Sequence, residues 1–219
     1  MNISQFRFYP IIFVCLLFFS IATVTAHPHS WVSVLTEIEG DNKQITGLTM
    51  FWTFDLMTTS YTLDGEDLSE SHRQKTLQNL ADEMVGNLKE NDYFTYFKKQ
   101  QSRLPFKVPQ QARLILEDHQ LTLHFFLELE KPLLLPVTDL HLQVYEDSYY
   151  VDFLWLQASD LQLSENFMAA CDMKIIEPNP TTTQMIYAAS LLIDAQPDSQ
   201  LGPIFSQSVT INCQETRDE

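Results

Sequence analysis

The residues best suited to chemistry in this sequence are two histidines that follow a hydrophobic leader, in the order Ala26-His27-Pro28-His29. Cleavage after Ala26 would leave His27 as the first residue. Its amino group, its imidazole and the imidazole of His29 would then lie close together along the chain. Nitrogen donors of this kind bind borderline divalent cations such as zinc. The sequence therefore predicts a metal-binding amino terminus.

The leader has the features of a secretory signal peptide. Arg7 provides a positive charge, residues 11–24 form an apolar stretch, and small residues precede position 27. We expect residues 1–26 to be a signal peptide and residues 27–219 to form a single exported domain in the periplasm. The apolar stretch is shorter than the roughly 20 residues of a membrane-spanning helix, so no direct membrane insertion is expected after cleavage.

The charge balance excludes some partners. Residues 27–219 hold 12 Lys and Arg against 29 Asp and Glu, a net charge of −17. Such a field repels nucleic acid and attracts cations. The chain also lacks a glycine-rich phosphate loop, a Gly-x-Ser-x-Gly motif and a His-Glu-x-x-His motif. We therefore expect a protein that is not an enzyme and does not bind nucleic acid.

The cysteines predict a disulfide. Cys15 lies in the leader, which leaves Cys171 and Cys213 in the exported chain. An even pair in an oxidising compartment is most simply a disulfide. A metal site in this protein would then use histidine and carboxylate ligands instead of thiolates.

The early part of the chain predicts a β-hairpin followed by helices. Residues 30–38 and 44–54 are rich in β-formers and are separated by a Gly-Asp-Asn-Lys turn. Residues 55–63 predict a short helix. Apolar residues at spacings of three and four predict an amphipathic helix over residues 69–90, with Ser69 as its cap.

The rest of the chain alternates with period two and predicts mainly strands. The predicted strands are 93–97, 113–117, 120–130, 140–145, 149–154, 173–177 and 208–213, with a short helix within 183–195. Strands 140–145 and 149–154 are expected to form a second hairpin. The fold class is therefore α+β, with mainly antiparallel β-sheet layers and one long amphipathic helix inserted early. A soft subdomain boundary is expected near residues 131–138.

Three further side chains are candidates for the site. Asp55 stands at a strand-to-helix junction, where it could face a metal or cap the helix. His124 alternates with apolar residues in a strand, so it is either a metal ligand or a packed or surface residue. Asp147 lies in a turn, where it could bond its own backbone or form a functional turn. The candidate metal ligands are therefore His27, His29, His124 and Asp55.

Several short motifs, in this order, resemble those of one protein family. They are the leader ending in Ala, His-Pro-His-Ser-Trp-Val (27–32), Phe-Trp-Thr-Phe-Asp (51–55), Leu-Lys-Glu-Asn-Asp-Tyr-Phe-Thr-Tyr (88–96) and Val-Tyr-Glu-Asp-Ser-Tyr-Tyr-Val (144–151). The chain resembles a family of uncharacterised bacterial proteins labelled as the periplasmic component of an ABC-type transport system. The resemblance covers nearly all of the exported chain. It implies a soluble exported protein that works beside inner-membrane permeases for zinc, nickel or cobalt.

The leading hypothesis is a periplasmic accessory protein that captures or delivers a divalent transition metal for an inner-membrane permease or transporter. Zinc is the first choice, with nickel, cobalt or copper as alternatives. A second hypothesis is a copper histidine-brace oxidase or monooxygenase, in which His27 and another imidazole such as His124 hold copper. Pro28 has no amide hydrogen, which excludes full ligation through deprotonated backbone amides. A third hypothesis is a metal-free structural partner of a permease.

Overall fold

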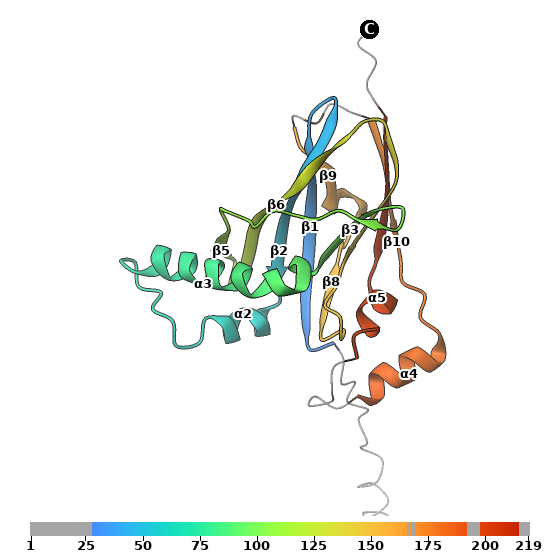
Figure 1. Cartoon of the computed structure of the whole chain (residues 1–219). Coiled ribbons are helices and arrows are strands. Elements are labelled where there is room, and N and C mark those ends of the chain that lie inside the picture. Colours follow the sequence, from blue (N-terminus) through green and yellow to red (C-terminus); the bar gives the residue numbers. More distant parts are fainter. Residues whose placement is uncertain (1–27, 166, 168–169, 192–197, 215–219) are drawn as a thin grey trace, which may run out of the picture.

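The protein folds into two β-sheets with helices packed around them, as Figure 1 shows. The computed structural model describes residues 28–165, 167, 170–191 and 198–214. The prediction of an α+β fold with mainly antiparallel sheets and one long early helix is confirmed. The predicted signal peptide and His27 lie outside the described residues. Within the described residues, no helix is both long and apolar enough to cross a bilayer.

The first sheet contains the predicted amino-terminal hairpin. Its strands are β1 (Ser30–Gly40), β2 (Gln44–Phe54), β5 (Arg113–Glu117), β6 (Gln120–Leu134), β8 (Val151–Leu154) and β9 (Leu161–Leu163). The order is β5-β6-β2-β1-β8, and β9 also pairs with β1. The hairpin of β1 and β2 is confirmed. Strand β1 pairs in parallel with both β8 and β9, whereas the other pairs of this sheet are antiparallel.

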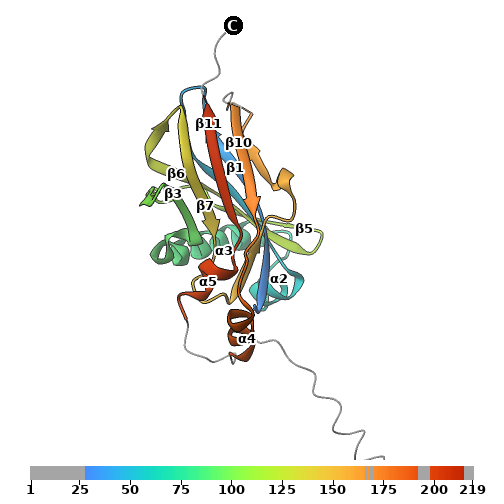
Figure 2. The same cartoon turned by 90° about the vertical axis from the view of Figure 1, so that its right-hand side faces the viewer.

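The second sheet is antiparallel and carries the disulfide. Its strands are β3 (Thr95–Lys99), β4 (Ser102–Arg103), β7 (Val137–Val144), β10 (Ala170–Ile176) and β11 (Ser208–Gln214). The order is β10-β11-β7-β3-β4, and Figure 2 shows β11 between β10 and β7. Cys171 and Cys213 face each other on β10 and β11 and form the predicted disulfide, which is confirmed.

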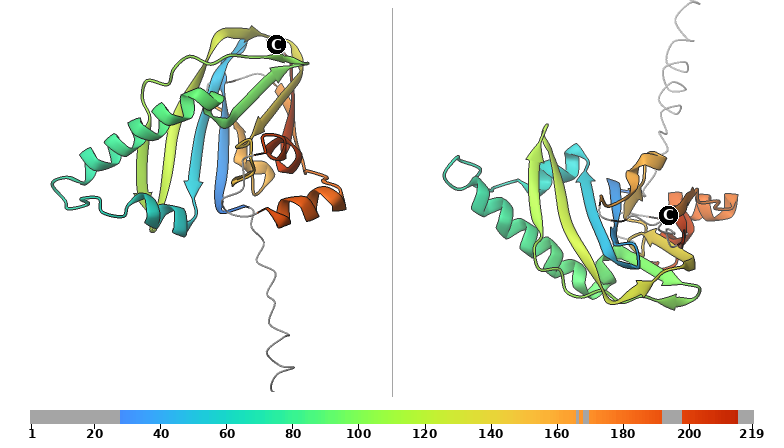
Figure 3. Two further views of the ribbon diagram at one scale, coloured as in Figure 1. Left: turned by 60° about the horizontal axis from the view of Figure 1, so that its bottom comes forward. Right: turned by 90° about the horizontal axis from the view of Figure 1, so that it is seen from above.

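The core lies between the sheets and under the long helix. Strand β6 alternates strictly, so that Leu121, Leu123 and Phe125 are buried on one face while the residues between them point outward. Helix α3 (Arg73–Leu88) covers this inner face next to β5 and contributes Leu77 and Ala81 to the same core. Figure 3 shows α3 alongside the β5 end of the first sheet, with the second sheet beyond the other end.

The shorter helices connect and flank the sheets. They are α2 (Leu56–Thr62), the 3-10 helix η1 (Lys89–Phe94), the 3-10 helix η2 (Ala158–Asp160), α4 (Thr182–Ser190) and α5 (Leu201–Phe205). Helix α2 matches the short helix predicted over residues 55–63. Helix α4 begins where the last helix was expected, and the rest of that prediction falls partly outside the described residues.

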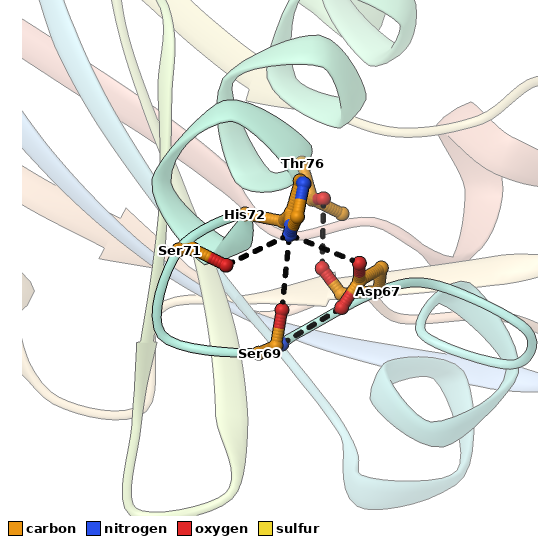
Figure 4. Close-up of polar contacts among 5 residues, drawn as sticks. All are labelled: Asp67, Ser69, Ser71, His72 and Thr76. Atoms are coloured by element: carbon orange, nitrogen blue, oxygen red, sulfur yellow. Dashed lines mark hydrogen bonds and ion pairs between the residues drawn. The ribbon is translucent and has the colours of Figure 1, made fainter.

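The start of α3 differs from the prediction. The helix begins at Arg73, and Ser69 is not its cap. Ser69 belongs instead to a preceding turn, in which its amide donates to Asp67 Oδ1 at 3.0 Å. Figure 4 shows Ser69 Oγ, Ser71 Oγ and Asp67 Oδ2 around His72 Nδ1, at 3.1, 3.0 and 3.2 Å. The polar side chains thus stabilise a turn here, and the first helical residue moves four positions later.

The predicted hairpin of residues 140–145 and 149–154 is wrong. Strand β7 lies in the second sheet, whereas β8 joins the first sheet beside β1. Each strand buries one face, and alternation alone does not say which sheet that face belongs to. The chain passes from the first sheet to the second immediately before β7, because β6 ends at Leu134 in the first sheet and β7 begins at Val137 in the second. The subdomain boundary expected near residues 131–138 stays a prediction.

The disulfide generates a stability prediction. The two cysteines are 42 positions apart in the sequence. Replacing both with Ala should lower the free energy of unfolding by about 3–4 kcal/mol, because the unfolded chain regains the entropy that a closed loop of this length removes. Urea unfolding of the double variant and the wild type measures the difference. Alkylation of the unreduced wild type provides the control, and two labelled thiols there would contradict the assignment.

Candidate functional site

The second predicted histidine ligand is anchored to the body of the protein. His29 immediately precedes β1, and its amide donates to the carbonyl oxygen of Tyr150 at 2.9 Å. Its ring lies against the ring of Tyr150, with 4.6 Å between the centroids. The side chain is half-buried. The imidazole of His29 is therefore held at one end of the first sheet, and His27 lies two residues earlier, outside the described residues.

The loop that carries Tyr150 is organised by Glu146. The carboxylate of Glu146 accepts hydrogen bonds from the amides of Ser148 at 3.0 Å and of Tyr150 at 2.8 Å, and from the hydroxyl of Ser148. Asp147, the predicted functional residue of this turn, points elsewhere and accepts from the hydroxyl of Tyr96 at 3.0 Å. Glu146 therefore sets the position of the carbonyl that holds His29.

Sequence reasoning selected the neighbouring acid and missed Glu146. The sequence feature that could have indicated Glu146 is a carboxylate two residues before a serine in a turn. This spacing lets the side chain accept hydrogen bonds from backbone amides that follow it in the turn. The rule that favours aspartate in this role gave preference to Asp147. The structure instead uses the longer side chain of Glu146 to reach the amide of Tyr150 four residues later.

Asp55 is the N-cap of α2. Its Oδ1 accepts from the amides of Met57 at 2.8 Å and Thr58 at 2.9 Å. Its Oδ2 accepts from the Thr58 hydroxyl at 2.7 Å, the Trp31 amide at 3.0 Å and the Ser30 hydroxyl at 3.3 Å. Five hydrogen bonds fill the roughly four lone-pair directions of a carboxylate. The side chain therefore connects the start of β1 to the start of α2.

The hydrogen bonds of Asp55 also set its ionisation. Burial raises the pKa of this carboxyl, but the hydrogen bonds that it accepts together outweigh burial and hold the pKa below its ordinary value of 3.8. The carboxyl is therefore ionised at neutral pH, and its charge is directed at backbone amides and hydroxyls of β1 and α2.

The structure does not bring His124 to His29. His124 is on β6 and lies opposite Phe51 on β2, and Phe51 in turn lies opposite Leu35 on β1. Leu35 is six residues from His29, which is about 20 Å along an extended chain at about 3.3 Å per residue. The His124 ring packs on Phe51 on the outer face of the sheet, and the Arg113 Nε–H donates to His124 Nδ1 at 2.8 Å. Burial first, and then the charge of Arg113, lowers the pKa of this imidazole.

No complete metal site is formed by the residues that can be described. Among them, no group of three or more His, Cys, Asp or Glu side chains is arranged to hold a metal ion. This finding does not include His27 or the amino group that cleavage would create there. A site at His29 would therefore be completed from the chain that precedes Pro28.

A cleft opens beside His29. It has a volume of about 600 Å³ and lies between the inner face of the first sheet and the helices α2 and α3. Its floor is formed by strand residues that are almost fully buried, namely Val32, Trp52, Leu123 and Phe153. His29 and Tyr150 also line it. His29, the described histidine of the predicted metal-binding terminus, is therefore part of the wall of this cleft.

The contacts of Asp55 generate a prediction. Asp55→Ala should lower the free energy of unfolding at pH 7 by about 1–2 kcal/mol, because the amides at the start of α2 and of Trp31 lose their acceptor. Asp55→Ser, which keeps a capping oxygen, should lose less. The difference between wild type and Asp55→Ala should shrink as the pH falls below 3.8, since the native pKa lies below this value. Urea unfolding across pH 3–7 would measure it, and equal stabilities at pH 7 would refute the capping role.

Two adjacent acids allow a matched comparison. Glu146→Ala should lower the free energy of unfolding by about 1–2 kcal/mol, because the amides of Ser148 and Tyr150 lose a charged acceptor. Asp147→Ala should cost about 0.5–1 kcal/mol, because it removes one exposed hydrogen bond. Amide exchange at His29 and Ser30 should accelerate in the Glu146 variant and stay unchanged in the Asp147 variant. Equal effects of the two substitutions would contradict this assignment.

Comparison with known proteins identifies the family but gives no activity. A family model described as "Protein of unknown function (DUF1007)" matches residues 11–213. An uncharacterized protein of Haemophilus influenzae (strain ATCC 51907 / DSM 11121 / KW20 / Rd) is 30% identical over 194 residues, which cover 87% of this chain and 93% of that relative. No solved structure matches the chain. The transport role implied by the sequence motifs therefore stays a prediction, and the chain belongs to the DUF1007 family of proteins of unknown function.

Proposed function

We propose that the processed, exported protein binds a divalent transition metal at its amino terminus and delivers it to an inner-membrane transporter. Zinc is the first choice, with nickel, cobalt and copper as alternatives. The observation that carries the proposal is the anchoring of His29, whose amide is bonded to Tyr150 and whose ring packs on the Tyr150 ring. One imidazole of the predicted chelating terminus is thus already held on the folded body.

The chemistry of the terminus suits borderline cations. A chain that begins at His27 would supply an amino nitrogen and two imidazoles within three residues, and these are donors that zinc, nickel and copper prefer. Anchoring of His29 reduces the conformational entropy that metal binding would otherwise have to overcome. The acidic charge of the exported chain attracts cations to the protein at long range.

The structure narrows the proposed ligand set. The oxygens of Asp55 are occupied by five hydrogen bonds, and His124 lies on the outer face of the sheet beside Arg113. We therefore assign the metal to His27 and His29 alone, with the remaining positions left to water or to a donor from the transporter. Open positions of this kind suit a carrier, because a transporter ligand can enter before the ion leaves.

The copper-brace alternative is less well supported. A brace that uses His124 as its second imidazole needs that ring near His27, and His124 lies about 20 Å from His29 by strand rise. A non-enzymatic role stays a prediction. The metal-free permease partner is the remaining alternative, and the experiment below separates it from the other two.

The test is calorimetric titration of protein that begins at His27 with zinc, nickel, cobalt and copper. His29→Ala should weaken zinc or nickel binding at least about tenfold, or 1.4 kcal/mol, because one imidazole is lost. His124→Ala and His72→Ala are the matched controls and should leave the affinity unchanged. A variant with one extra residue before His27 should still bind, because both imidazoles remain.

Three other outcomes would change the assignment. Equal losses from His29→Ala and His124→Ala would contradict the proposed ligand set. Binding of copper alone, abolished by the extra residue, would favour the brace enzyme. Absence of binding in every version would leave the metal-free partner.

A further inference from the structure

We propose that the cleft beside His29 binds an uncharged, mainly apolar small molecule. The cleft lies on the inner face of the first sheet, between α2 and the carboxyl-terminal half of α3. This inference goes beyond the proposed metal function, because binding in the cleft requires no metal.

The lining of the cleft selects an uncharged ligand. The described residues that line it include no Lys, Arg, Asp or Glu, although the chain as a whole holds 29 Asp and Glu. An ion placed against such walls would lose its hydration without gaining a partner of opposite charge. The floor is aromatic and aliphatic, since Trp52 packs edge-on against Phe125 and at a tilt against Phe153. The walls therefore favour rings or hydrocarbon chains over charged groups.

The size of the cleft matches one small molecule. Its volume of about 600 Å³ falls within the range of about 300–1,000 Å³ that is typical of small-molecule sites. The floor residues Val32, Leu123 and Phe153 are almost fully buried, so the cleft is closed below. A closed floor of this kind fits a compact ligand better than an extended peptide.

The rim of the cleft is apolar and exposed. Met57 and Tyr61 on α2 are 64% and 85% exposed, and Tyr150 on the opposite side is 41% exposed. A ligand in the cleft would cover these side chains and remove apolar surface from water, which favours binding. Methionine also adapts readily to different apolar shapes, and tyrosine offers a large aromatic face.

The cleft also has polar groups, on Ser30, Thr58 and Asn87 and on the Trp52 indole, whose buried Nε1 has no hydrogen-bond partner within the described part of the chain. The hydroxyl oxygens of Ser30 and Thr58 lie 2.7 Å apart, and each is within hydrogen-bonding distance of Asp55 Oδ2, so the protons of both hydroxyls are used within this cluster. Asn87 on α3 is exposed and lines the cleft. We therefore expect the ligand to place its apolar part on the floor and one neutral polar group beside Asn87.

The test uses N-phenyl-1-naphthylamine, an uncharged dye that fluoresces in apolar surroundings, and protein that begins at His27, in EDTA. Wild type should bind the dye saturably. Met57→Arg should weaken binding at least about tenfold, because it places a charge at the apolar rim. Asn87→Trp should also weaken it at least about tenfold, because a larger side chain narrows the mouth. Thermal unfolding of each variant would show that it is folded.

The matched control is Met185→Arg. Met185 is an exposed methionine on α4 that does not line the cleft, so this variant adds the same charge at another apolar position. Its dye affinity should stay within about twofold of wild type, which corresponds to less than about 0.5 kcal/mol. Equal losses from Met57→Arg and Met185→Arg, or the absence of saturable binding by wild type, would overturn the inference. A protein that binds zinc but not the dye would overturn the cleft assignment alone.

Discussion

The arrangement of this protein depends on the pairing of β1 along both of its edges. On one edge β1 forms a hairpin with β2, and on the other it pairs in parallel with β8 and β9. Parallel pairing requires a long connection, and here it runs from the end of β1 at Gly40 to the start of β8 at Val151. The pairing brings the loop of residues 145–150 to the amino-terminal end of β1. The anchor of His29 and one wall of the cleft both result from this contact.

Two acids near the cleft serve the backbone. Asp55 ties the start of β1 to α2, and Glu146 orders the loop that holds His29. Each carboxylate accepts amide hydrogens that would otherwise need water as a partner. Both acids are therefore used for local structure, which is why the position of Asp55 at a strand-to-helix junction was a weak indication of metal ligation.

Local patterns were sufficient for most elements and insufficient for their assembly. The β1–β2 hairpin, α2, β5 and the disulfide follow from alternation, turn residues and cysteine count, which are encoded nearby in the sequence. The parallel pairing of β8 with β1 joins residues about 120 positions apart, so it was predicted wrongly as a hairpin with β7. The cap at Ser69 failed because several polar side chains compete for that turn. The cleft is lined by five separate stretches of the chain, within residues 29–32, 52–61, 84–94, 123 and 150–153, and no single segment encodes it.

The position of His29 links the two proposed sites. Its imidazole is assigned to the metal, and the same residue lines the apolar cleft. If the contacts between the ligand and this imidazole differ between the metal-bound and the metal-free protein, the ligand changes the free energy of metal binding. Thermodynamic linkage then requires the metal to change the affinity of the cleft by the same factor. A carrier with such coupling would release its ion more easily when the cleft is filled, provided that the ligand and the metal disfavour each other at His29.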